Sequence, residues 1–285
     1  MIRKLTNRRG NQRDRIHGDN PTLKTLVFAM VTTIVIANSI IVFSEADKRH
    51  SIALWILNFT AFTASALGVV TICRYGIHGI HGRSYLYLTI GIILWCSADF
   101  VVLYSYYALP AEEREKASIA DALWFIGYGF LSLHLFTVLR SVYKIINLKL
   151  AVMVALLCLL FIFYNLFALF SSENILKDID LIAIIVTIAY PVLDLTLIIP
   201  SILVLLSLRR DHQQSIPWFL SSLSLLINAL ADDGYVYDFA NGNMGNLWFW
   251  ELFYVADFII IAGALIWYNK FHISYELSTR KLNVK

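Results

Sequence analysis

The chain has 285 residues, of which 59% are hydrophobic and 15% charged, and its mean hydropathy is +0.67. A soluble domain of ordinary composition has roughly 45–50% apolar and about 25% charged residues, so this composition excludes an ordinary soluble globular protein. The formal net charge of +3 is small, and its distribution along the chain is more informative than its value.

Eight apolar stretches follow one another along the chain, and each is long enough to cross a bilayer. A spanning helix needs about 20 mainly apolar residues, and a spanning segment must be helical because lipid offers no partner to an open backbone. The stretches cover 24–44, 52–73, 85–107, 119–140, 149–171, 180–207, 217–236 and 246–269. We therefore predict an all-α polytopic membrane protein with eight transmembrane helices. The segment 76–82 between the second and third helices, rich in Gly and His, is predicted to be a turn.

Basic residues are unevenly distributed between the predicted loops. The two termini and every second loop hold 18 of the 23 Lys and Arg residues, and the alternate loops hold the other five, Lys48, Arg49, Arg114, Lys116 and Lys177. Positive residues stay on the cytoplasmic side of a membrane, so we expect both termini to be cytoplasmic in a cell membrane. The basic segment 1–23 sets this orientation and suits an anionic leaflet. We expect no nucleic-acid partner.

An internal repeat divides the predicted helices into two groups. Ala98-Asp99-x4-Tyr104 near the end of the third helix is followed by Trp124-x3-Tyr128 in the fourth. Ala231-Asp232-x4-Tyr237 and Trp250-x3-Tyr254 repeat this order in the seventh and eighth helices. We predict two tandem four-helix units, 24–147 and 148–270, related by a pseudo-two-fold axis along the membrane normal and flanked by the tails 1–23 and 271–285.

Acidic residues lie inside the predicted helices, and no Lys or Arg lies in a helix interior to neutralise them. Charged residues in a bilayer are costly, by about 2.5–3.5 kcal/mol on insertion scales, so they indicate function. Helical spacing places many of them on polar stripes, which face a bundle interior rather than lipid. One stripe holds Ser221, Ser224, Asn228 and Asp232, a second Thr187, Tyr190 and Asp194, and a third Glu251, Tyr254 and Asp257.

The acids predict an outward-facing polar cavity that binds a small ligand or cation. Its candidate ligand-binding residues are Asp99, Asp194, Asn228, Asp232, Glu251, Tyr254 and Asp257. The alternative is that these side chains form interhelical hydrogen bonds that hold the bundle together. We predict no metal site and no cofactor, because no His, Cys and acid spacing matches a metal set. His134 is interpreted as a hydrogen-bonded packing residue.

The first resemblance is to a bacterial sensory region. The A-D-x4-Y element, the segment Ala120 to Tyr128 (A-D-A-L-W-F-I-G-Y) and Ala189-Tyr-Pro-Val-Leu-Asp194 resemble, in the same order, the eight-helix membrane region ahead of diguanylate cyclase or histidine kinase domains. The resemblance covers roughly residues 85 to 265 and implies a sensory function. Only about 15 residues follow the last predicted helix, so it implies that a signal passes to a separate cytoplasmic protein.

A more distant resemblance is to the lysoplasmalogenase family of eight-helix hydrolases. The segment Phe253 to Gly263 (F-Y-V-A-D-F-I-I-I-A-G) is similar to that family's Y-Y-x-A-Q-x-L-I-x-x-G, with Asp257 in place of Gln. Ile126 to Ser132, followed by His134, is similar to its fourth-helix motif. This resemblance implies a lipid hydrolase in which Asp99 and Asp232 act as general base and general acid.

Three functions therefore remain as expectations. The first is a membrane-embedded sensory or ligand-binding module that is not itself an enzyme. The second is the intramembrane lipid hydrolase. The third is a cation- or proton-coupled transporter, which ranks last because the cytoplasmic half of the helices is mostly apolar.

Overall fold

The computed structural model describes residues 21–110, 118–142, 146–171, 181–208, 215–240 and 247–273, and eight long α-helices account for most of them. The first four are α2 (Pro21–Val42), α3 (Arg49–Tyr75), α4 (Gly79–Ala108) and α6 (Ile119–Val142). The second four are α7 (Leu148–Ser171), α8 (Leu181–Ser207), α9 (Ile216–Ala240) and α10 (Trp248–Trp267), and α10 continues into the π-helical turn η4 (Tyr268–Ile273). The predicted all-helical fold is confirmed for these residues.

Six of these helices, α2, α3, α4, α6, α8 and α10, are long and apolar enough to cross a membrane. In α7 the apolar stretch among the described residues is shorter, Leu148–Tyr164. The chain is therefore a multi-pass membrane protein.

The predicted turn over 76–82 is too long. Helix α3 ends at Tyr75 and α4 already begins at Gly79, six residues before the predicted start of that helix. The reversal is tight because Gly76 and Gly79 take positive φ angles of 82° and 73°, a region that glycine occupies without steric cost. Polar residues at the membrane boundary extend the helix beyond its apolar stretch.

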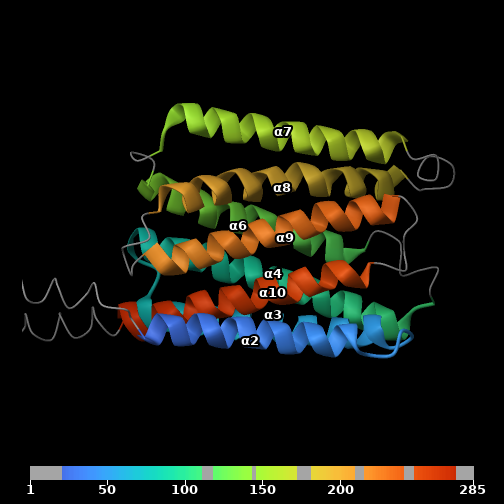
Figure 1. Ribbon diagram of the computed structural model, residues 1–285, viewed down its shortest axis with the longest axis horizontal. Coiled ribbons are helices and arrows are strands. Elements are labelled where there is room, and N and C mark those ends of the chain that lie inside the picture. Colours follow the sequence, from blue (N-terminus) through green and yellow to red (C-terminus); the bar gives the residue numbers. More distant parts are fainter. Residues whose placement is uncertain are drawn as a thin grey trace, which may run out of the picture.

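Six helices form a closed ring, and two lie outside it. Going around the ring, α3 packs against α4, α4 against α6, α6 against α8, α8 against α9, and α9 against α10, which closes on α3. Helix α2 packs on α10 and α3, and α7 on α8 and α9. Figure 1 shows α2 and α7 at opposite edges of the bundle. The polar stripe of α9 that holds Ser221, Ser224, Asn228 and Asp232 faces the interior of the ring.

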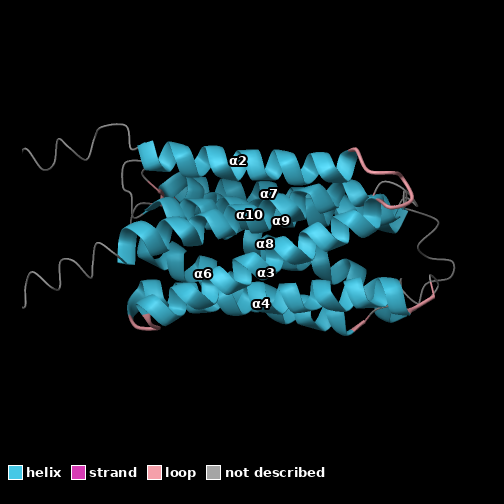
Figure 2. Ribbon diagram, turned by 90° about the horizontal axis from the view of Figure 1, so that it is seen from below, coloured by secondary structure: helices cyan, strands magenta, loops and turns pink. Residues whose placement is uncertain are grey.

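The two ends of the bundle differ in charge. Helix α2 begins, and η4 ends, at the same end (Figures 1 and 2). The helix ends found there carry Lys24, Arg74, Arg83, Arg140, Lys149 and Lys270. Among the described residues of the opposite end, the basic side chains are Lys48 and Arg49. The basic segment 1–20 and the loop residues Arg114, Lys116 and Lys177 lie outside the described residues. We call the end with the helix starts of α2 and α4 the basic end.

Helices α4 and α6 approach closely at two glycines. A Cβ added to Gly127 would lie 2.4 Å from Cδ1 of Trp95, and one added to Gly91 would lie 2.6 Å from Cγ of Leu131. Small residues let helix backbones approach in this way inside a membrane. The contact fixes the rotation of α6, and with it the direction of the neighbouring Tyr128 side chain.

Replacing Gly127 with Val should lower the free energy of unfolding by about 1–3 kcal/mol, because the added methyl groups overlap the Trp95 ring. Gly129→Val is a matched control on the same helix, since a Cβ added to Gly129 would meet no atom within 4 Å. Unfolding midpoints of the two purified variants in the same detergent provide the measurement. Equal midpoints would contradict close packing at Gly127.

Candidate functional site

Most of the predicted acidic residues lie in the half of the bundle away from the basic end, and Asp194 lies at the middle of α8. Asp99 lies nine residues before the end of α4, and Asp257 lies nine residues after the start of α10. At 1.5 Å per residue each is about 14 Å from its helix end. Asp99, Asp194, Glu251 and Asp257 are buried, whereas Asp232 is partly exposed.

The centre of the site is the hydroxyl group of Tyr128, which contacts two aspartates from different helices. The Tyr128 oxygen, on α6, lies 2.7 Å from Oδ1 of Asp194 on α8 and in a short contact with Oδ2 of Asp232 on α9. Tyr254, on α10, donates its hydroxyl proton to Oδ1 of Asp232 at 2.5 Å. We call Tyr128, Asp194, Asp232 and Tyr254 the carboxylate–tyrosine cluster. It joins four helices across the interior of the ring.

Two other predicted acids have separate partners. Asp257 accepts hydrogen bonds from the Ser224 hydroxyl and, at 3.0 Å, from Nδ2 of Asn228. Asp99 accepts a hydrogen bond of 3.3 Å from the indole nitrogen of Trp124. Both aspartates nevertheless interact electrostatically with Asp232. The structure therefore brings Asp194 and Asp232 together through one hydroxyl, but gives Asp99 and Asp257 other donors.

Glu251 lies nearer to the rim than the other acids. Its Oε1 is 2.7 Å from Nδ1 of His50 at the start of α3. The Glu251 side chain is buried, whereas His50 is about half exposed. This pair links α3 to α10 beside Arg49, whose guanidinium lies 4.5 Å from the ring centre of Trp248. Glu251 is thus a contact at the rim and not a member of the carboxylate–tyrosine cluster.

Several buried carboxylate oxygens lack a hydrogen-bond partner among the described residues. They are Oδ2 of Asp194, both oxygens of Asp233 and Oε2 of Glu251. Asp194 is fully buried and Asp233 is 2% exposed, and both interact electrostatically with Asp232. An ionised carboxylate without a donor is costly in such a place. Oxygens of this kind are available to a ligand.

The titratable groups described around the cluster are acidic. The ion pairs Lys48–Glu45 and His50–Glu251 do not touch the cluster. Within the residues that the structure describes, no group of three His, Cys, Asp or Glu side chains is placed to hold a metal ion. The described groups that interact electrostatically with Asp232 include acids and tyrosines.

Helical stripes found most of these residues, but two important ones were missed. Tyr128 belongs to the W-x3-Y motif, and Asp233 follows Asp232 directly, yet neither was among the predicted ligand-binding residues. The signal for Asp233 was a second acid in a membrane helix, a costly feature that needs a reason. The side chain of Thr187, which was placed on a polar stripe, lies outside the described residues.

His134 forms a second polar centre, closer to the basic end. Its Nδ1 is 2.8 Å from the hydroxyl of Ser84 on α4, and its Nε2 is 3.2 Å from the hydroxyl of Ser221 on α9. His134 is fully buried. The imidazole thus joins three helices of the ring.

Replacing His134 with Ala should lower the free energy of unfolding by about 2–4 kcal/mol. The substitution opens a cavity and leaves the Ser84 and Ser221 hydroxyls without the imidazole. Ser221→Ala removes only one of these contacts and should cost about 1 kcal/mol. Chemical unfolding of both variants in the same detergent gives the two values. A smaller loss for His134→Ala than for Ser221→Ala would contradict the bridging role of the imidazole.

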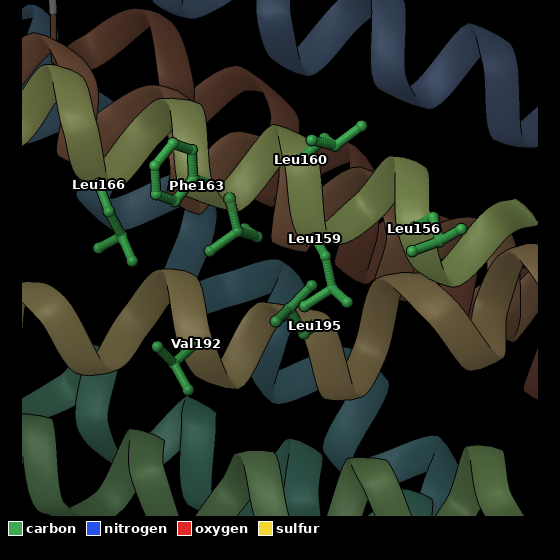
Figure 3. A pocket seen from close by; sticks show the side chains of 8 residues that line it. Leu156, Leu159, Leu160, Phe163, Leu166, Val192 and Leu195 are labelled. Atoms are coloured by element: carbon green, nitrogen blue, oxygen red, sulfur yellow. The ribbon is translucent and has the colours of Figure 1, made fainter. Parts of the chain in front are cut away.

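One surface groove is apolar and lies on the outer side of the ring. It runs between α7 and α8, where leucine side chains of α7, among them Leu159 and Leu166, point toward α8 and its Val192 and Leu195 (Figure 3). Its lining offers acyl chains a complementary surface and holds no group for chemistry. The polar chemistry of the described residues is therefore concentrated inside the ring.

Comparison with family models, curated proteins and solved structures found no match to the chain, so the assignment of a function depends on the site itself.

Proposed function

We propose that the chain is a membrane-embedded sensory module that binds a small cation in the carboxylate–tyrosine cluster and signals to a separate cytoplasmic protein. The observation that carries this proposal is the Tyr128 hydroxyl shared between Asp194 and Asp232. Within the described part of the chain, Oδ2 of Asp194 and both oxygens of Asp233 have no hydrogen-bond partner, and Asp233 interacts electrostatically with Asp194 and Asp232. These groups attract positive charge and do not complete one another's hydrogen bonds.

The position of the cluster suits a signalling role. Asp194, Asp232, Tyr128 and Tyr254 come from α8, α9, α6 and α10, so a ligand that changes their contacts acts on four helices at once. Packed helices shift between discrete arrangements rather than deforming continuously. A change at the cluster can therefore reach the basic end of α8 directly, and that of α3 through the packing of α3 on α10. A cytoplasmic partner would bind at these helix ends.

The architecture that accompanies this proposal is two four-helix units with eight crossings. In the ring order α3, α4, α6, α8, α9, α10, a half-turn places each helix of the first unit on its counterpart in the second. This arrangement supports a pseudo-two-fold axis. The outer helices follow it only in part, since α2 packs on α10 and α3 whereas α7 packs on α8 and α9.

The orientation in this proposal has both termini in the cytoplasm of a cell membrane. It is supported by the basic residues at the helix ends beside the termini, since positive charge stays on the cytoplasmic side. The cluster then lies in the outer half of the membrane, where extracellular solutes have the shorter path to it.

Cation binding can be tested by thermal unfolding of the full chain in lipid nanodiscs. A panel from sodium and potassium to methylammonium and spermidine should include at least one cation that raises the unfolding midpoint, because a ligand that binds only the folded state stabilises it. Asp232→Asn should abolish that increase. Glu45→Gln, at an exposed acid near the same rim, should keep it. The proposal fails if no cation in the panel stabilises the wild type.

The lipid hydrolase is a second candidate, because Asp99 interacts electrostatically with Asp232 inside the ring. On this reading the two carboxyl groups act as general base and general acid on a bound ester or vinyl ether. Purified chain would then hydrolyse lysolipids, and Asp99→Asn and Asp232→Asn would each abolish the activity. Wild-type inactivity on a broad panel of lysolipids would reject this candidate.

A further inference from the structure

The Tyr128 hydroxyl has fewer protons than it has carboxyl contacts. A tyrosine hydroxyl has one proton and can donate it to one acceptor. The Tyr128 oxygen is nevertheless within hydrogen-bond distance of both Asp194 and Asp232. If both carboxyl groups were ionised, one of these contacts would join two oxygens with no proton between them. One of the two aspartates must therefore supply a proton.

The other partners show which aspartate carries it. Asp232 accepts a 2.5 Å hydrogen bond from the Tyr254 hydroxyl and is partly exposed. Both the hydrogen bond and the partial exposure stabilise a negative charge on Asp232. Asp194 is fully buried, and its Oδ2 has no partner among the described residues. We propose that Asp194 binds a proton and donates it to the Tyr128 oxygen, while Tyr128 donates its own proton to ionised Asp232.

Asp233 is a second proton-binding group of the same site. It is 2% exposed, and both of its oxygens lack a hydrogen-bond partner among the described residues. It interacts electrostatically with Asp194 and Asp232. A neutral carboxylic acid tolerates this environment far better than a carboxylate, because burying an unpaired charge is costly.

The described titratable groups that face the site from the neighbouring helices are acids and tyrosines. They are Asp99 on α4, Tyr128 on α6, Tyr190 on α8, and Tyr254 and Asp257 on α10. None of these groups is cationic. Loss of the Asp194 proton would leave two carboxylates competing for one hydroxyl, and the repulsion would separate α8 from α9. The inference rests on the proposed function, because it names the proton as a ligand of the same carboxylates.

Infrared spectroscopy of the full chain in lipid nanodiscs tests this inference. At neutral pH the wild type should show the C=O stretch of a buried, protonated carboxyl group. Asp194→Asn should remove one component of that band. Glu45→Gln should leave the Asp194 component unchanged, since Glu45 is an exposed acid outside the ring. Tyr128→Phe should shift the Asp194 component without removing it, because the acceptor of its proton is lost.

Absence of a protonated carboxyl band in the wild type, or a band that Asp194→Asn leaves intact, would overturn the inference. Failure of this proposal can be told from failure of the proposed function. Cation-dependent stabilisation without the band overturns proton binding alone. The Asp194 band without any cation-dependent stabilisation supports proton binding and rejects the other cations as ligands.

Discussion

Replacing Tyr128 with Phe should lower the free energy of unfolding by about 2–4 kcal/mol. The substitution keeps the ring and its packing but removes the hydroxyl that contacts Asp194 and Asp232. A hydrogen bond to a charged group contributes about 1.5–3 kcal/mol, and a buried group left without its partner adds a further desolvation cost. Chemical unfolding of the purified variant in the same detergent as the wild type measures the loss.

Tyr104→Phe is the matched control for this substitution. Tyr104 lies near the same end of the neighbouring helix α4, but it is 71% exposed. Surface substitutions of this kind usually change stability by less than about 0.5 kcal/mol. A Tyr128→Phe variant as stable as Tyr104→Phe would show that the shared hydroxyl does not hold the cluster together.

Replacing Asp233 with Leu should have the opposite effect and raise the free energy of unfolding by about 1–3 kcal/mol. Exchanging buried ionisable groups for apolar ones of similar size is often neutral or stabilising, by up to about 4 kcal/mol. Asp233 gives up no hydrogen bond among the described residues when it is replaced. Asp238→Leu on the same helix should destabilise, because Asp238 accepts a 2.8 Å hydrogen bond from the indole of Trp250. Unfolding midpoints in detergent separate the two outcomes.

The sign of the Asp233 effect distinguishes a binding site from a structural clamp. If a carboxyl group holds helices together, its replacement should destabilise the bundle. If a carboxyl group is kept for binding and destabilises the fold, its replacement should stabilise the bundle and weaken ligand binding. Loss of stability in Asp233→Leu would therefore contradict the assignment of Asp233 to a binding site.

The helices themselves could be predicted closely from the sequence. A run of about 20 apolar residues has one stable form in lipid. The predicted and observed bounds therefore agree within a few residues, except at the start of α4. The stripe that holds Ser221, Ser224, Asn228 and Asp232 faces the interior of the ring because a polar face avoids lipid, whichever helices surround it.

The partners of each acid could not be predicted, because they depend on which helices become neighbours. Asp99 and Asp232 occupy equivalent places in the predicted repeat, yet Asp99 accepts a hydrogen bond from an indole and Asp232 has two tyrosine contacts. The ring order that places Tyr128 opposite Asp232 follows from the packing of the whole bundle. The outward opening of a polar cavity remains a prediction.

The distance between the basic ends of α3 and α8 tests most directly whether the cluster is coupled to the basic end of the bundle. Spin labels can be attached to the exposed Cys73 and to Leu206→Cys, where the native side chain is 57% exposed, after the buried Cys96 and Cys158 are replaced by Ala. Between mildly alkaline and mildly acidic pH, the distance distribution in nanodiscs should shift in the chain that retains Asp194, and Asp194→Asn should abolish the shift. A distribution that ignores pH, or that shifts equally in Asp194→Asn, would contradict coupling through this cluster.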